Sequence, residues 1–316
     1  MNVNEIRNTK ILIYGSGAIG SIFGGKLALA GVHITMLARG NRFEELKNEG
    51  IILKNAINGK VEKIKVPIIH TLKENDIYDY IIIVVQNTQI DSILPILSKN
   101  KSSNMVFVVN NPCGYQKYID SVGYDRVMIG FPSAGGERKD GIVSYFIGKG
   151  PAKLFQATTF GEVNGKKTER LKKLLQVFKS AGFSPSQNNN MMDWQKTHVA
   201  VIVPIGKALY KFNSNNYELA KSPETLKKMI LSIRECFTLL KKKEVKITPA
   251  KLNFFYLPCF ILVPIFSIGM NTKIAEFAMS KHTIVAKDEM EVLEKLFIEM
   301  LGETEENMHY LNSLNL

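Results

Sequence analysis

Apolar residues in the first half of the chain come in short, unbroken runs, each followed by glycine or by polar residues. The runs span residues 10–14, 32–37, 79–85, 105–109 and 127–131. Such runs are typical of strands buried on both faces of a parallel sheet. Residues 17–30 between the first two runs have helical apolar spacing, and residues 51–66 contain Asn58-Gly59, a favoured hairpin turn. We therefore predict strands alternating with helices through right-handed crossovers.

The second half of the chain has a different pattern. Residues 169–181 form an amphipathic helix pattern, and a polar stretch follows at 184–190. Beyond it, strand-like runs disappear and long helical stretches take over at 191–210, 222–244 and 283–302. We predict an α/β protein with a Rossmann-type dinucleotide-binding domain over residues 1–184 and an all-α substrate and dimerisation domain over 185–316.

The first predicted turn carries a G-x-G-x-x-G motif. It comprises Gly15, Ser16, Gly17, Ala18, Ile19 and Gly20. The motif follows a strand and opens a helix, which is the context that dinucleotide binding requires. Gly15 permits a tight turn, Gly17 lets the backbone approach a pyrophosphate, and Gly20 allows close packing of helix on strand. The helix N-terminus then offers N–H groups to the phosphates.

The end of the second predicted strand bears on which cofactor binds. An NAD site usually has an acidic residue there, for the ribose 2′-hydroxyl. This chain has no acidic residue at that position and carries Arg39 and Arg42 instead. Guanidinium groups suit a 2′-phosphate, so we predict NADP(H) rather than NAD.

Composition narrows the function classes. The formal net charge is +12, and it has three competing interpretations: a surface that attracts nucleic acid, one that gathers an anionic cofactor and an acidic substrate, and an ordinary solvated surface. Lysine is dispersed along the chain, which favours the solvated surface. Nucleic-acid binding would rest on charge alone and is not expected. No histidine pair has metal-ligand spacing, so no metal is predicted. Three unpaired cysteines and a polar start without a secretory stretch favour the cytoplasm.

An almost uncharged segment, residues 252–270, approaches the length of a membrane span. Pro258 and Pro264 interrupt it, and each would break an isolated helix. We therefore predict a buried helix pair or a dimer face, and expect a homodimer with no membrane partner.

The chain resembles the ketopantoate reductase family from Lys10 to Leu209. The glycine motif and the Ala-Arg-Gly that ends the next strand match that family, as does Gly161-Glu162-Val163 with Gly165 as its closing strand and turn. The resemblance implies that Gln86 occupies a cofactor-binding position, where the family has a lysine. It also implies that Asn111, in VVNNPCG, faces cofactor and substrate, and that Lys196, in Trp194-Gln195-Lys196, is the catalytic lysine.

The sequence departs from the family after Lys196. The family has asparagines four and eight residues further on, where this chain has Ala200 and Pro204. The family's C-terminal serine and glutamate have no secure counterpart, and Glu276, Asp288 and Glu289 are candidates by location only.

We interpret the chain as an NADP-dependent reductase of a small, anionic 2-keto acid or related ketone. Lys196 would polarise the carbonyl, and Asn111 would order nicotinamide and substrate. The alternative is a dinucleotide-binding protein of the same fold that has lost turnover, such as a redox sensor. The missing asparagines favour that alternative.

Overall fold

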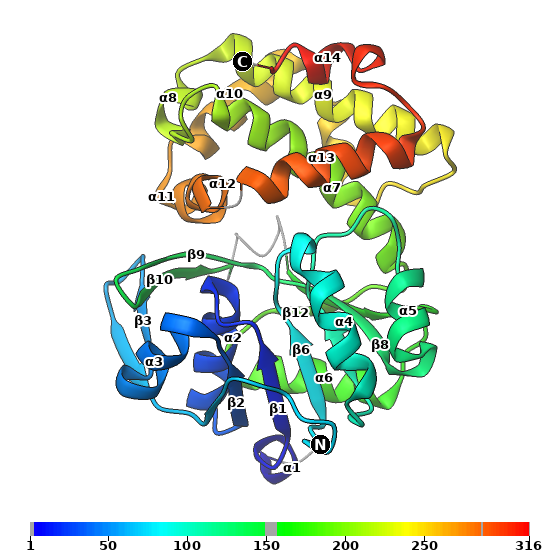
Figure 1. Cartoon of the computed structure of the whole chain (residues 1–316). Coiled ribbons are helices and arrows are strands. Elements are labelled where there is room, and N and C mark those ends of the chain that lie inside the picture. The colour runs from blue at the N-terminus through cyan, green and yellow to red at the C-terminus, as the bar shows by residue number, and fades with distance from the viewer. Residues whose placement is uncertain (1–2, 149–156, 286, 316) are drawn as a thin grey trace. The chain divides into compact units, whose positions relative to one another are not determined.

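The computed structural model describes residues 3–148, 157–285 and 287–315 (Figure 1). The chain divides into two compact units. The first comprises residues 1–109 and 115–191, and the second comprises 110–114 and 192–316.

The first unit is built on an eight-stranded sheet in the order β12-β11-β8-β7-β6-β1-β2-β5. Its strands are β1 (Lys10–Tyr14), β2 (His33–Leu37), β5 (Ile68–Ile69), β6 (Tyr80–Ile83), β7 (Met105–Phe107), β8 (Val127–Phe131), β11 (Thr158–Glu162) and β12 (Pro185–Gln187). Neighbouring strands are parallel throughout, except that β11 runs antiparallel to β8. The predicted α/β fold with a Rossmann-type first domain is confirmed, since all five apolar runs contain strands of this sheet.

Helices cover both faces of this sheet. They are α1 (Val3–Arg7), α2 (Ala18–Leu29), α3 (Gly40–Glu49), η1 (Asn87–Gln89), α4 (Ile90–Lys99), α5 (Gln116–Val122), η2 (Tyr124–Arg126) and α6 (Glu169–Ser180). On one face Phe23 of α2 meets Phe178 of α6 edge to face, with ring centroids 4.9 Å apart. On the other face Phe107 of β7 stacks on Tyr118 of α5 at 4.2 Å. The first contact joins α2, which follows the glycine motif, to α6, and the second holds α5 against the sheet.

A second, four-stranded sheet has the order β4-β3-β10-β9. It comprises β3 (Ile51–Asn55), β4 (Val61–Ile64), β9 (Ala134–Lys139) and β10 (Ile142–Ile147), and it packs on α2. The predicted hairpin at Asn58-Gly59 forms β3 and β4, with Gly59 at a φ of +72°. The hairpin of β9 and β10 was not predicted, because Gly135-Gly136 and Glu137 give β9 no apolar alternation.

The break between the two units lies after Met191 rather than after Ser184. The polar stretch that suggested the earlier boundary contains β12, which pairs with β11 from Thr158↔Pro185 to Phe160↔Gln187. A polar sequence forms an edge strand here because only one side of β12 carries a partner. Residues 110–114 follow β7 in sequence yet belong to the second unit.

The second unit is helical, as predicted. Its elements are α7 (Met191–Tyr210), α8 (Asn216–Ala220), α9 (Pro223–Lys242), η4 (Ala250–Tyr256), α10 (Cys259–Met270), α11 (Lys273–Ala275), η5 (Glu276–Ser280), α12 (Lys281–Val285), α13 (Lys287–Leu301), η6 (Glu305–Asn307) and α14 (His309–Asn312). Its apolar core gathers side chains such as Val203 of α7, Phe237 of α9 and Phe297 of α13.

The apolar segment 252–270 forms η4 and α10, which meet at a bend of 114°. Among the described residues no single helix has both the length and the apolar character to cross a membrane, although this bent pair reaches them together. Leu262 and Met270 are buried, but the outer face of α10 is not: Phe260 is 78% exposed and Ile268 is 73% exposed. The expectation of a helix pair buried within the domain is therefore only half right.

Candidate active site: cofactor cradle and lysine helix

Gly15 and Gly20 are fixed by backbone packing in the first unit. Gly15 has a φ of +116°, and a Cβ there would lie 2.2 Å from the carbonyl oxygen of Val84. A Cβ on Gly20 would lie 1.9 Å from the carbonyl oxygen of Gly15. Both positions therefore exclude any larger residue, because backbone atoms have no room to retreat.

Gly17 differs from the other two glycines of the motif. No atom lies within 4 Å of the place where its Cβ would be. Gly17 is also the N-cap of α2, and no side chain caps that helix. The backbone N–H groups at the start of α2, around Ala18 and Ile19, are thus available to a ligand beside open space. This cradle fits the pyrophosphate of a dinucleotide.

Arg42 is a buried residue that supports the glycine loop through hydrogen bonds. Its side chain is 8% exposed, and its guanidinium donates to the carbonyl oxygen of Ser16 (3.3 Å), to Ser21 Oγ (3.1 Å) and to Glu45 Oε2 (2.9 Å). Burial lowers the pKa of Arg42, and the hydrogen bond that Arg42 donates to Glu45 opposes that shift. The expectation that Arg42 pairs with a 2′-phosphate is wrong, because the first turn of α3 directs this side chain under the loop.

Arg39 is the arginine that remains available. It directly precedes α3, is exposed, and donates from Nη2 to the Tyr14 hydroxyl at 2.7 Å. Within the described part of the chain no carboxylate pairs with it. Gln86 follows β6 and caps η1, with its backbone N–H donating to Gln89 Oε1 at 3.1 Å. Gln86 is two residues beyond Val84, whose carbonyl contacts the Gly15 turn.

Lys196 lies in the second unit, on α7. Trp194 is buried and stacks on His198, with ring centroids 5.3 Å apart, so this part of α7 is firmly packed. Lys196 itself is half-buried, and no carboxylate of the described residues forms an ion pair with it. It is therefore a cation that an anionic substrate can approach.

The turn 110–114 packs in the same unit. Asn111 is 8% exposed, donates from Nδ2 to the Gly114 carbonyl at 2.6 Å and accepts from the Cys113 N–H at 2.9 Å. Its amide thus shapes the turn. The Cys113 thiol lies 3.9 Å from the carbonyl oxygen of Leu296 on α13.

Electrostatics link this turn to Lys196. Burial raises the pKa of the Cys113 thiol, Glu299 raises it further and Lys196 opposes the rise. The charges of Lys196 and Glu299 therefore both act on the Cys113 thiol. Glu299 was not singled out from the sequence, since no motif marks it. Of the acidic candidates, Glu276 accepts from the Tyr217 hydroxyl at 2.9 Å.

The two positions where the family's asparagines are missing are packed ones. Ala200 is fully buried and belongs to the apolar core of the helical unit. Pro204 is buried inside α7. Each replaces an amide by an apolar group that a core accepts without a hydrogen-bond partner.

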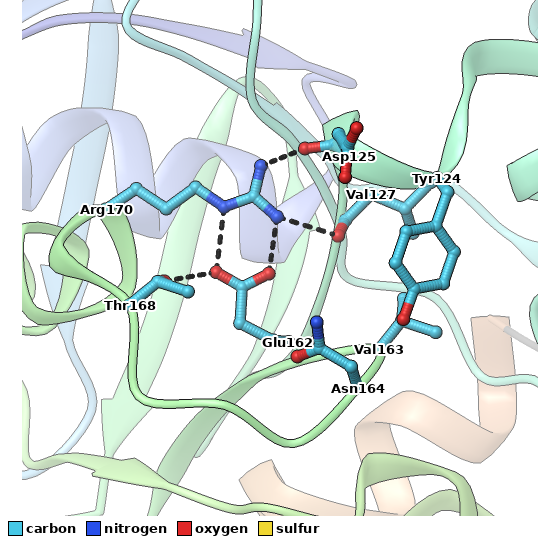
Figure 2. A pocket seen from close by; sticks show the side chains of 8 residues that line it. All are labelled: Tyr124, Asp125, Val127, Glu162, Val163, Asn164, Thr168 and Arg170. Atoms are coloured by element: carbon cyan, nitrogen blue, oxygen red, sulfur yellow. Dashed lines mark hydrogen bonds and ion pairs between the residues drawn. The ribbon is translucent and has the colours of Figure 1, made fainter.

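The first unit also has a hollow of about 390 Å³ at the amino ends of the parallel strands, where β8 begins and the antiparallel β11 ends (Figure 2). Figure 2 shows the Arg170 guanidinium facing the Glu162 carboxylate, with Nε 2.7 Å from Oε1. Glu162 is 3% exposed and also accepts from Thr168. These charges satisfy one another and brace the sheet, whereas ligands of such folds bind at the carboxyl ends of the parallel strands.

Comparison with known proteins agrees with this geometry. The family model described as ketopantoate reductase PanE/ApbA matches residues 11–159. A 2-dehydropantoate 2-reductase from Pyrococcus horikoshii is 28% identical over 225 residues, covering 69% of this chain and 71% of that protein. The chain is thus similar to the ketopantoate reductases, most clearly over residues 11–159.

Solved structures show the same fold at low identity. D-mandelate dehydrogenase in complex with NADH and anilino(oxo)acetate has a TM-score of 0.72 at 18% identity, covering 97% of this chain and 96% of that one. A dimeric ketopantoate reductase from Staphylococcus aureus has a TM-score of 0.65 at 14% identity, covering 96% of each chain. These structures share the fold that the resemblance in the sequence motifs implied.

Proposed function

We propose that this protein is an NADPH-dependent reductase of a small, anionic 2-keto acid or related ketone. The observation that carries the cofactor choice is Arg39, an exposed arginine just after β2 that no carboxylate of the described residues pairs with, near an open glycine cradle. The first unit would bind the dinucleotide through Gly15, Ser16, Gly17, Ala18, Ile19 and Gly20, with Arg39 and Gln86 beside them.

NADPH, when bound, supplies the hydride that adds to the ketone carbon. Negative charge then develops on the ketone oxygen. The Lys196 ammonium would stabilise that charge and give the oxygen a proton, leaving the neutral amine. Asn111 would act by holding the turn 110–114 in shape, because its amide bonds to Gly114 and Cys113.

The cofactor is tested by titrating the protein with NADPH and NADH while following the fluorescence of the bound nicotinamide. We expect tighter NADPH binding in the wild type. Arg39→Ala should weaken NADPH selectively by about 1.5–3 kcal/mol, the range for a hydrogen bond to a charged group. Lys179→Ala, an exposed lysine on α6, is the matched control for loss of one positive charge. Equal wild-type affinities for the two cofactors contradict the proposal.

The natural substrate is proposed to be less polar than ketopantoate. Ala200 and Pro204 replace two amides that would hydrogen-bond a polar substrate, and each missing bond costs about 1–3 kcal/mol. The fold is shared with D-mandelate dehydrogenase, whose structure holds anilino(oxo)acetate, an aromatic 2-oxo acid derivative. A steady-state assay decides the question. A kcat/KM on ketopantoate at or above about 10⁴ M⁻¹s⁻¹, the low end for ordinary enzymes, would refute it.

The alternative is a protein that binds the dinucleotide without turnover. The buried, apolar Ala200 and Pro204 favour it, since they leave fewer polar groups for a substrate. NADPH oxidation measured across a series of aliphatic and aromatic 2-keto acids separates the two functions. Tight NADPH binding with no oxidation by any member of the series supports the alternative.

The exposed face of α10 is proposed to bind a second copy of this chain. Phe260, Ile261, Ile265 and Ile268 form this α10 face, Leu257 lies exposed just before the helix, and no charged residue interrupts the sequence between Lys251 and Lys273. An exposed apolar patch with a polar rim is typical of a subunit interface. A relative of this fold, the ketopantoate reductase from Staphylococcus aureus, is dimeric.

A further inference from the structure

The side chain that accepts a hydrogen bond from Arg39 is a buried tyrosine, Tyr14. Tyr14 is the last residue of β1, directly before Gly15, and it is 3% exposed. Its hydroxyl accepts a hydrogen bond of 2.7 Å from Arg39 Nη2, and the Arg39 guanidinium carbon lies 5.9 Å from the centre of its ring. Arg39 is exposed and long, so without this contact it would sample many rotamers.

Burial raises the pKa of the Tyr14 hydroxyl, and the charge and hydrogen bond of Arg39 oppose that shift. The hydroxyl therefore stays neutral and accepts from the guanidinium without forming an ion pair. A carboxylate at this position would neutralise Arg39 and compete with a phosphate. A neutral acceptor leaves the full positive charge and the remaining N–H groups of the fork for a ligand.

The other arginine, Arg42, already uses its guanidinium in hydrogen bonds within the protein. Arg42 donates to Ser16, Ser21 and Glu45, so it fixes the glycine loop and cannot turn to a ligand without breaking these bonds. Selectivity between the two cofactors thus depends on Arg39 and on whatever fixes its direction.

We propose that Tyr14 is a positioning residue for cofactor selectivity: its buried hydroxyl aims the Arg39 guanidinium at the 2′-phosphate of NADP(H). The proposal rests on the proposed cofactor preference. It adds that the preference is set by two residues from adjacent strand ends, one of which never touches the phosphate. Pre-organising the arginine reduces the entropy lost when the phosphate binds.

The test is Tyr14→Phe in the full chain, with NADPH, NADH and the fragments 2′,5′-ADP and 5′-ADP as probes of direct binding. We expect NADPH and 2′,5′-ADP to bind about tenfold more weakly, corresponding to about 1.4 kcal/mol. NADH and 5′-ADP should change by less than about twofold, within the scatter of a neutral contact.

Tyr80→Phe is the matched control. Tyr80 lies on β6, next to β1 in the sheet, is 1% exposed and donates from its hydroxyl to the Arg170 carbonyl at 2.7 Å. Removing that hydroxyl perturbs the same sheet without touching Arg39, so the ratio of NADPH to NADH affinity should stay at the wild-type value. Thermal melting of both variants checks that each one folds.

A double-mutant comparison completes the test and does not depend on Tyr14→Phe alone. Adding Tyr14→Phe to Arg39→Ala should not lower the NADPH affinity further, because the guanidinium that Tyr14 positions is already absent. Equal weakening of NADPH and NADH by Tyr14→Phe, or no weakening of either, overturns the role of Tyr14 while leaving the cofactor proposal intact. Wild-type preference for NADH overturns both.

Discussion

The three glycines of the motif have different surroundings, although they are the same residue type. Gly20 packs its α-carbon against the Gly15 carbonyl, whereas Gly17 borders open space. Replacing glycine by alanine should therefore lower the folding stability at Gly20 and the dinucleotide affinity at Gly17.

Gly20→Ala should destabilise the first unit by several kcal/mol, because a methyl group 1.9 Å from a backbone oxygen forces α2 away from β1. Gly17→Ala should fold normally and lose dinucleotide affinity, because its methyl group occupies the approach to the pyrophosphate. Urea unfolding and NADPH titration of both variants check this. Normal folding of Gly20→Ala, or normal NADPH binding by Gly17→Ala, contradicts the assignment of roles.

The thiol of Cys113 reports on the charge of Lys196. Burial and Glu299 raise the pKa of this thiol and Lys196 lowers it. Because the thiolate is the reactive form, alkylation by iodoacetamide should be slow at neutral pH and accelerate only above the ordinary thiol value of 9.0.

Lys196→Met should move that acceleration to higher pH, and Glu299→Gln should move it to lower pH. The rates are measured by mass spectrometry of the peptide that contains Cys113, with Lys207→Met on the same helix as a control for charge. Identical pH profiles for wild type and Lys196→Met would show that the lysine does not face the turn 110–114.

At the scale of elements, α10 differs from the other long helices. α9 buries one face in the core of its unit, as its alternating apolar and charged residues require. α10 is apolar all round, so its inner face packs on α9 and its outer face remains exposed. A helix with this composition indicates a second contact surface.

Phe260→Asp should convert a dimer to a monomer, because pairing the α10 faces would then bury two carboxylates without partners. Light scattering coupled to size-exclusion chromatography measures the mass. Ile57→Asp is the control, since Ile57 is also exposed but lies between β3 and β4. A wild-type monomer that sediments with anionic lipid vesicles would mean that a membrane surface, and not a second copy, covers α10.

At the scale of the whole molecule, the two units allow their stabilities to be followed separately. Trp194 is the single tryptophan and lies in the second unit, so its fluorescence reports on that unit. Tyr210 lies in the same unit, donates to the Thr283 carbonyl and has a pKa raised by burial, and then by Glu291 and other acidic residues, to about 12.

Stability of the second unit should fall in alkaline solution. Below pH 10.0, the ordinary tyrosine value, folded and unfolded states carry the same proton; above it the unfolded state loses the proton first, so unfolding becomes more favourable until about pH 12. The urea midpoint of Trp194 fluorescence, followed from neutral pH upward, should decrease. Tyr210→Phe should flatten this decrease, whereas Tyr310→Phe, at an exposed position, should leave it unchanged.

The sequence by itself determined five of the eight strands of the main sheet, the glycine cradle and the family resemblance, because apolar runs and G-x-G-x-x-G are local patterns with local causes. The helices α6, α7 and α9 were predictable for the same reason. The positions of Lys196 and Asn111 entered through the resemblance and not through the residues alone.

Only the tertiary structure decided which arginine faces solvent, since Arg39 and Arg42 are indistinguishable until α3 turns one of them under the loop. It also decided that polar β12 is an edge strand, that Ala200 is a core residue and that the charges of Glu299 and Lys196 act on Cys113. Each of these depends on contacts between residues far apart in the chain. The periodicity of the sequence does not specify which distant residues come together.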